Sequence, residues 1–73
     1  MSEKEIRGEI KNILSKYNLF HDDFSEEINS IEFITLIIDI EDTFDIVIEE
    51  EKLVISDFAN VNSITEYIIE RRK

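Results

Sequence analysis

The sequence contains no cysteine, no proline, no tryptophan and only one glycine, Gly8. The lack of cysteine excludes disulfides, thiolate metal sites and thiol nucleophiles, and it fits a reducing compartment. A single glycine excludes the glycine-rich loop that cradles phosphate groups in nucleotide-binding proteins. Because glycine and proline are so scarce, sharp turns must be made by Asn, Asp and Ser.

Recognisable catalytic and metal-binding patterns are missing as well, although carboxylates are plentiful. The only histidine, His21, precedes Asp22 and Asp23, but neighbours in sequence need not face one another, and a solvated surface histidine is the favoured interpretation. The carboxylates lack the Asp-x-Asp-x-Asp-Gly spacing of a calcium loop. A domain this small rarely has the pocket that a general acid–base pair needs. We therefore expect a protein that is not an enzyme and has no intrinsic metal.

Long apolar runs are also missing. No run approaches the ~20 residues that span a bilayer, so we expect no membrane segment. Residues 1–5, Met-Ser-Glu-Lys-Glu, are too charged for a signal peptide. These features predict a soluble, cytoplasmic protein.

The sequence contains few basic residues. The 8 Lys and Arg residues are outnumbered by 18 Asp and Glu residues, which gives a net charge of −10. This balance argues against nucleic-acid binding, which needs clustered Lys and Arg to neutralise phosphates. It favours electrostatic steering toward basic protein partners, although acidity that serves only solubility is an equally weighted alternative.

The length of 73 residues predicts one domain, residues 1–73, and 42% apolar residues suffice for its core. Ser2 and Glu5 have the spacing of a capping box that opens a first helix. Asn18 is a plausible stop for this helix. An apolar stripe with helical spacing lies between them and comprises Ile6, Ile10, Ile13, Leu14 and Tyr17.

The helical period is lost between residues 18 and 28. Phe20, Phe24 and Ile28 recur there among acidic and polar residues. One interpretation is a long loop held by three buried apolar side chains, and the other is a frayed helical turn. We favour the loop, because Asn18 and two aspartates interrupt the pattern.

A second helix is predicted to begin at Asn29, which can cap it together with Glu32 in a second capping box. Its core face is predicted from the helical period, with Ile34 at the edge of this face. Ile31 and Ile38 project from another side, beside Thr35 and Asp42. They are either scattered surface residues or the apolar centre of a docking surface with an acidic rim. The residues of the core face are Phe33, Leu36, Ile37, Ile40 and Phe44.

The stretch from Asp45 to Ser56 is ambiguous. Two β-branched runs flank acidic residues and would suit a hairpin, but an isolated hairpin has little stability, so a loop with buried apolar anchors is preferred. Residues 56–60 can form one short helical turn. Ser63 and Glu66 resemble a third capping box that opens a last helix with a basic end. The elements together predict an all-α fold with three main helices and a short one.

Ser30 stands in the first turn of the second helix, directly after the cap. A phosphate group attached there would face free backbone N–H groups and the positive end of the helix dipole. The residues alone leave two roles open for this serine: an ordinary capping residue or a site for a phosphodiester.

Residues 28–33, Ile-Asn-Ser-Ile-Glu-Phe, resemble the attachment motif of acyl carrier proteins, usually Leu-Asp-Ser-Leu or Leu-Asp-Ser-Ile followed by an acidic residue. Residues 40–46, Ile-Glu-Asp-Thr-Phe-Asp-Ile, are similar to the stretch that ends the family's second helix. Residues 53–58 and 61–64 are similar to its short third helix and the start of its fourth. The spacing between the blocks agrees, and the resemblance covers roughly residues 28–69.

The resemblance implies a small four-helix bundle of acyl-carrier type, with a long loop between helices 1 and 2. It implies that Ser30 accepts 4′-phosphopantetheine from coenzyme A through a separate phosphopantetheinyl transferase that uses Mg²⁺. The thiol of this arm would carry acyl or aminoacyl groups as thioesters, in fatty-acid, polyketide or related biosynthesis. We expect a monomer that docks through its second helix on acyl-transferring or acyl-activating enzymes with basic patches. The docking positions carried over are Ile31, Glu32, Thr35, Ile38, Glu41 and Asp42.

The sequence departs from the family pattern at three places. Asn29 stands where the family has an aspartate that contacts the transferase, the usual glycine before the motif is missing, and Val47 or Ile48 replaces a common proline. These departures indicate a divergent, pathway-specific carrier. The alternative is a carrier-like fold that is never primed and acts as an acidic protein-interaction module.

Overall fold

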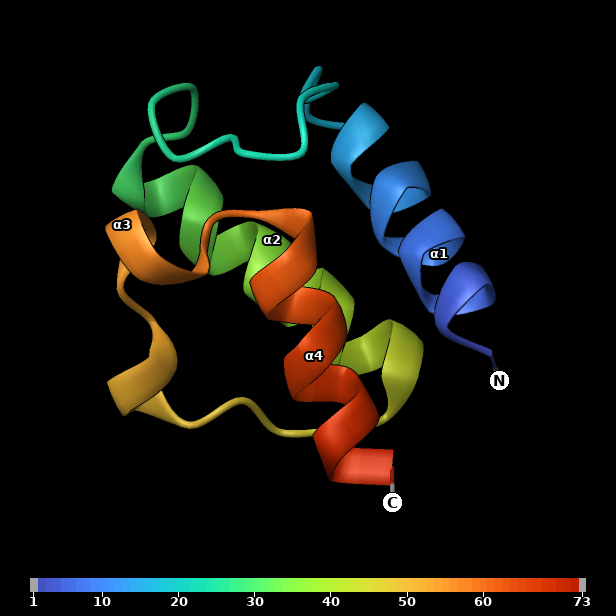
Figure 1. The fold of residues 1–73 in the computed structure, drawn as a ribbon. Helices are drawn as coiled ribbons and strands as arrows, with labels where there is room; N and C mark the ends of the chain where they lie inside the picture. Colours follow the sequence, from blue (N-terminus) through green and yellow to red (C-terminus); the bar gives the residue numbers. More distant parts are fainter. Residues whose placement is uncertain (1, 73) are drawn as a thin grey trace.

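The computed structural model describes residues 2–72, which form helices joined by loops (Figure 1). No strand occurs within this described range, and its one β-type feature is an isolated antiparallel bridge between Asp23 and Asn60. The predicted all-α class is confirmed, with three main helices, a short third helix and a long loop between the first two. The elements are α1 (Glu3–Ser15), α2 (Ser30–Phe44), the 3-10 helix η1 (Glu50–Lys52), α3 (Ile55–Phe58) and α4 (Val61–Arg72).

The first helix begins as the sequence predicts. The Ser2 hydroxyl accepts a hydrogen bond from the Glu5 amide, and the Glu5 carboxylate accepts one from the Ser2 amide, both at 3.2 Å. The hydrogen bond from the Ser2 amide, followed by the Ser2 hydroxyl, lowers the pKa of the exposed Glu5 carboxyl. Asn18 turns the chain away after the helix with a φ of 60°, a left-handed conformation that asparagine tolerates better than most residues.

Gly8 lies on the exposed side of α1, and apart from its chain neighbours and the backbone of its own helix no heavy atom lies within 4 Å of the place where a Cβ would be. Gly8→Ala is therefore expected to raise the free energy of unfolding by about 1 kcal/mol, because alanine loses less backbone entropy in a helix. Urea denaturation followed by circular dichroism measures the change. A destabilised variant would show that Gly8 has a role besides helix formation.

The core lies where α1, α2 and α4 meet, with α4 and α2 both packed against α1. The predicted inner face of α2 is confirmed, since each of its five residues is at most 2% exposed. The stripe of α1 is buried too, except that Tyr17 lies beyond the helix end and is half-buried. Within residues 2–72, no helix has both the length and the apolar character that crossing a membrane requires.

The connection between α1 and α2 is the predicted loop, but one of its anchors differs. Phe24 and Ile28 are buried, whereas Phe20 is 75% exposed, so the prediction of three buried anchors is wrong for Phe20. Leu19 takes its place in the core. The left-handed turn at Asn18 brings the Leu19 amide to within 3.1 Å of the Leu14 carbonyl oxygen, and the next side chain then points outward.

The segment after α2 contains no hairpin within the described residues. Ile48 is buried and Val47 is 74% exposed, which fits a loop held by an apolar anchor. The predicted short turn is present as α3. The predicted third capping box is wrong, because α4 begins before Ser63: the side chain of Asn60 accepts a hydrogen bond from the Ser63 amide at 2.8 Å and caps the helix.

Candidate functional site

Ser30 is the first residue of α2, at the end of the molecule beside α3 (Figure 1). Asn29 caps the helix: its side-chain oxygen accepts a hydrogen bond from the Glu32 amide at 2.8 Å. The Glu32 carboxylate accepts one from the Asn29 amide at 3.3 Å. The second predicted capping box is thus confirmed, and it fixes the backbone on both sides of Ser30.

The Ser30 side chain is exposed, and its hydroxyl forms no hydrogen bond with residues 2–72. Asn29 already provides the helix cap, so the hydroxyl of Ser30 is not needed for that purpose. The first amides of a helix have no intrahelical acceptor, and the helix dipole is positive at this end. The site can therefore present a free hydroxyl beside backbone donors suited to an anionic group.

The loop before Ser30 is tied to the junction of α3 and α4. The Phe24 amide donates to the Ala59 carbonyl oxygen at 3.0 Å, and the Val61 amide donates to the Asp22 carbonyl oxygen at 2.8 Å. The Asp23 carboxylate accepts hydrogen bonds from the amide and hydroxyl of Ser25, which lower the pKa of this exposed carboxyl. These bonds and the buried Phe24 hold the start of α2 in place.

The outer face of α2 carries an apolar stripe, which we call the α2 patch: Ile31, Ile34 and Ile38. Their exposed fractions are 80%, 46% and 51%, unusually high for isoleucine. The two predicted patch residues, Ile31 and Ile38, are thus on the surface, as the helical period predicts. Ile34 extends the stripe; its spacing of three from Ile31 and four from Ile38 was the signal that links it to them.

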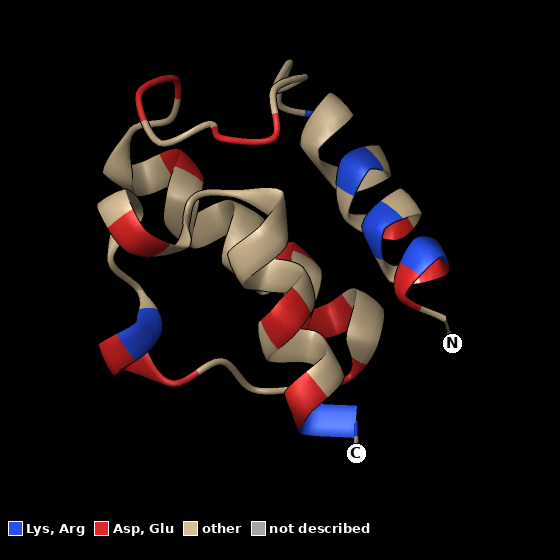
Figure 2. Ribbon diagram, viewed as in Figure 1, with Lys and Arg blue, Asp and Glu red and all other residues tan. Residues whose placement is uncertain are grey.

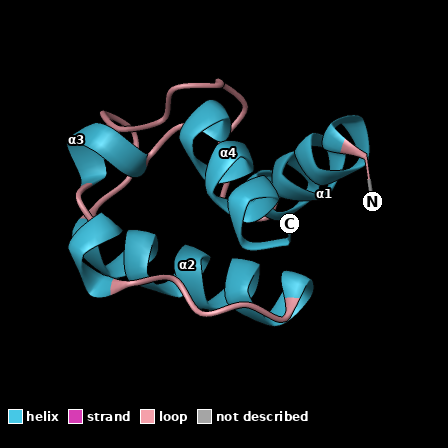
Figure 3. Ribbon diagram, turned by 60° about the horizontal axis from the view of Figure 1, so that its bottom comes forward, coloured by secondary structure: helices cyan, strands magenta, loops and turns pink. Residues whose placement is uncertain are grey.

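The polar docking candidates differ in their surroundings. Glu32, Thr35 and Asp42 are exposed, and the Thr35 hydroxyl donates to the Ile31 carbonyl oxygen at 3.0 Å. Glu41 is half-buried, and its carboxylate accepts a hydrogen bond from the Ile48 amide at 2.7 Å. In Figure 3 the loop that follows α2 passes in front of this helix, and the Ile48 hydrogen bond ties the first part of the loop to Glu41. Glu41 thus holds this loop, which limits its freedom to contact a partner.

The charged residues on α2 and in its flanking loops are all acidic apart from His21. No Lys or Arg occurs between Lys16 and Lys52, a stretch that contains the whole of α2. Figure 2 shows the basic residues on α1, at η1 and at the end of α4. A basic partner surface would therefore meet the least repulsion at α2 and its flanking loops.

Two contacts fix the far half of α2. The Tyr17 hydroxyl donates to the Asp39 carboxylate at 2.6 Å, and the Arg72 guanidinium donates to the Phe44 carbonyl oxygen at 3.1 Å. Burial, followed by the Asp39 carboxylate, raises the pKa of Tyr17 to about 12. Tyr17 thus keeps its proton at neutral pH, and its stabilising effect would be lost only as the pH rises from 10.0 through about 12.

His21 lies outside this arrangement. Its Nδ1 is 2.6 Å from the Glu27 carboxylate on the exposed loop, and its side chain is 75% exposed. Among residues 2–72, no group of three or more His, Cys, Asp or Glu side chains is placed to hold a metal ion.

No protein-family model, curated protein or solved structure matches this chain.

Proposed function

We propose that this protein is an acyl carrier: a small cytoplasmic protein that holds acyl or aminoacyl groups as thioesters on a 4′-phosphopantetheine arm attached to Ser30. The observation that carries the proposal is the free, exposed hydroxyl of Ser30 at the capped start of α2, inside a sequence that resembles the attachment motif of acyl carrier proteins. The order of helices around it is compatible with that family.

The attachment reaction would use the hydroxyl of Ser30 as its acceptor. The Ser30 oxygen would form a new ester bond to the phosphorus next to the pantetheine, the phosphoanhydride bond of coenzyme A would break, and the nucleotide part would leave. The serine proton would pass to a base of the transferase, because no titratable side chain among residues 2–72 forms a hydrogen bond with the Ser30 hydroxyl. The attached arm would supply the thiol that this cysteine-free chain lacks.

The α2 patch is the surface that we propose for the partner enzymes. Its three isoleucines supply exposed apolar area, and Glu32 and Asp42 supply acidic charge on the same helix. An apolar centre with a charged rim is typical of protein–protein interfaces. The partners would be the transferase and then acyl-activating or acyl-transferring enzymes with basic docking surfaces.

Asn29 supports a second candidate function. An asparagine keeps the helix cap but lacks the negative charge that the family's aspartate offers to the transferase. The chain could then be an unprimed interaction module that uses the α2 patch alone. Priming decides between these two functions, because only the carrier needs the arm.

Incubation with coenzyme A, Mg²⁺ and a phosphopantetheinyl transferase is expected to add the mass of one phosphopantetheine group to the protein. Intact-mass spectrometry measures the gain, and Ser30→Ala is expected to abolish it. Because the Ser30 side chain makes no hydrogen bond within residues 2–72, this variant should keep its circular dichroism spectrum. Failure of several transferases, including one from the source organism, to modify the wild-type chain would contradict the carrier function.

Asp42→Lys is expected to slow association with the transferase or an acyl-activating partner by about threefold to tenfold at low salt, with a smaller effect at high salt. Asp42 is exposed and forms no ion pair among residues 2–72, so the fold should be unchanged. Glu9→Lys, on α1 and away from α2, is the matched control for overall charge. Stopped-flow binding measures both rates, and equal slowing would show that only net charge matters.

A further inference from the structure

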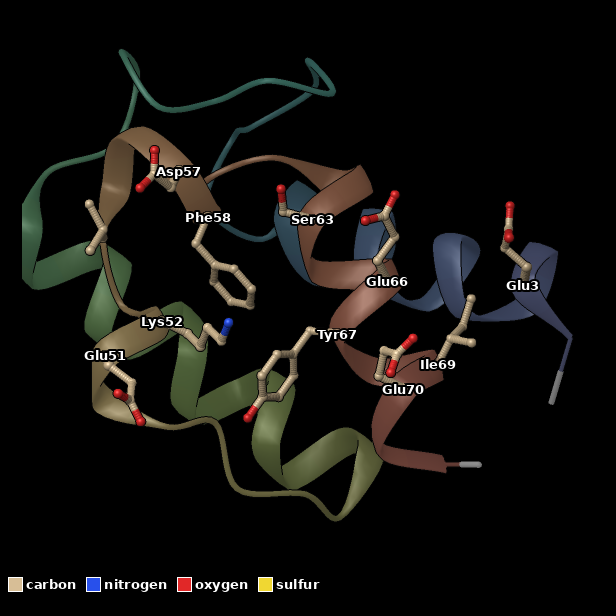
Figure 4. Close-up of a pocket in the computed structure, with 11 residues that line it drawn as sticks. Glu3, Glu51, Lys52, Asp57, Phe58, Ser63, Glu66, Tyr67, Ile69 and Glu70 are labelled. Carbon is tan, nitrogen blue, oxygen red and sulfur yellow. The ribbon is translucent and has the colours of Figure 1, made fainter.

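A groove of about 690 Å³ lies between η1, α3 and α4 and extends past α4 toward the start of α1 (Figure 4). Its volume is within the range of sites that hold ligands, about 300–1,000 Å³. Residues of α2 do not line it, so it is separate from both Ser30 and the α2 patch. Its apolar lining residues, which form the floor, are Val54, Phe58, Tyr67 and Ile69; Val54 is 45% exposed and Phe58 only 5%.

The aromatic part of the floor is held in a fixed arrangement. The rings of Phe58 and Tyr67 meet edge to face, with centroids 5.8 Å apart and planes at 87°. The Tyr67 hydroxyl accepts hydrogen bonds from the Glu49 amide at 3.2 Å and from Arg71 Nε at 3.1 Å. The ring is thus fixed from the loop side, and the Arg71 guanidinium lies over one of its faces, 5.2 Å from the ring centroid. A preformed apolar surface of this kind lowers the ordering cost of binding.

The rim of the groove is acidic. Glu51, Asp57 and Glu66 are exposed, and no ion pair within residues 2–72 neutralises their carboxylates. Figure 4 shows these three carboxylates around the two aromatic rings. Lys52 is the only basic residue among the described residues that line the groove. An anionic ligand would therefore be repelled.

We propose that this groove binds a Lys- and Arg-rich amphipathic helix of a partner protein. The apolar side chains of that helix would pack on Val54 and Tyr67, and its basic side chains would reach the rim carboxylates along their own apolar stems. A small polycation would satisfy the charges but leave the apolar floor uncovered. A neutral apolar ligand would gain no attraction from the rim carboxylates. Only a ligand that is both apolar and basic matches the floor and the rim together.

The proposal is tested with the full chain and a fluorescent Lys/Leu amphipathic peptide of roughly eighteen residues, long enough for several helical turns. Fluorescence anisotropy measures the affinity. Glu66→Lys is expected to weaken binding by about threefold to tenfold, whereas Glu26→Lys, which makes the same charge change outside the groove, is expected to weaken it by less than about twofold. An oligolysine peptide of equal charge should bind at least about tenfold more weakly, because it cannot cover the floor.

Amide chemical shifts of the wild-type protein provide a readout that does not depend on a variant's folding. The Lys/Leu peptide is expected to shift the amides of residues 51–70, and shifts confined to α2 would overturn the proposal. Equal losses in Glu66→Lys and Glu26→Lys, or equal binding of oligolysine, would also overturn it, since net charge alone would then explain binding. Ser30→Ala is expected to bind like the wild type, so failed priming and failed groove binding are separate results.

Discussion

Phe24→Ala is expected to lower the free energy of unfolding by about 3–5 kcal/mol, the usual cost of removing a buried phenylalanine. Phe24 is fully buried although it lies in the loop before α2, and its amide is bonded to Ala59. A domain of this length has a total stability of only about 4–11 kcal/mol. The variant should therefore be marginally folded, and its priming should fall because the start of α2 loses its support.

Phe20→Ala is the matched control, since it makes the same chemical change four residues earlier. Phe20 is 75% exposed, so its removal is expected to change the free energy of unfolding by less than about 0.5 kcal/mol. Urea denaturation followed by circular dichroism compares the two variants. Similar losses for both would show that the loop does not anchor in the core through Phe24.

Asn29→Asp is expected to speed priming by a generic transferase by about tenfold or more in kcat/KM. The new carboxylate can form a charge-assisted contact with basic groups of the transferase, and such contacts are worth about 1.5–3 kcal/mol. The same carboxylate still caps α2 through the Glu32 amide, and a negative charge at a helix start stabilises by about 0.3–1 kcal/mol. Steady-state kinetics with coenzyme A measure the gain.

Asn29→Ser distinguishes the effect of the added negative charge from the effect of the helix cap. Serine also caps helices, so this variant should fold like the wild type, but it adds no charge and should not be primed faster. A similar rate for Asn29→Asp and the wild type would remove the explanation that the missing carboxylate limits priming. Faster priming of Asn29→Ser would instead point to backbone flexibility at the cap.

Most of the candidate site could be predicted from the sequence, because the capping box and the helical period that define it involve residues close together in the chain. A capping box needs only residues three apart, so Asn29 and Glu32 predict the start of α2 and the place of Ser30 on it. The exposed stripe of Ile31 and Ile38 follows from the helical period alone. Ile34 was predicted only as an edge residue, because the period cannot show how far a neighbour covers an edge position.

The cap of α4 shows how two local signals can compete. Ser63 and Glu66 match a capping box, yet Asn60 caps the helix instead. The reason is tertiary: Asp23 pairs with Asn60 in an isolated bridge, and the Val61 amide is bonded to Asp22. These long-range bonds hold residues 59–61 where a helix can begin, and Ser63 is then already inside it.

The sequence by itself determined the all-α class, the inner face of α2 and the position of Ser30, because helical periodicity and capping act over a few residues. The tertiary structure decided which loop residues are buried, with Leu19 inside and Phe20 outside. It also tied Glu41 to the loop after α2 and brought η1, α3 and α4 together around the groove. Such features depend on segments far apart in the chain, whose packing no local pattern encodes.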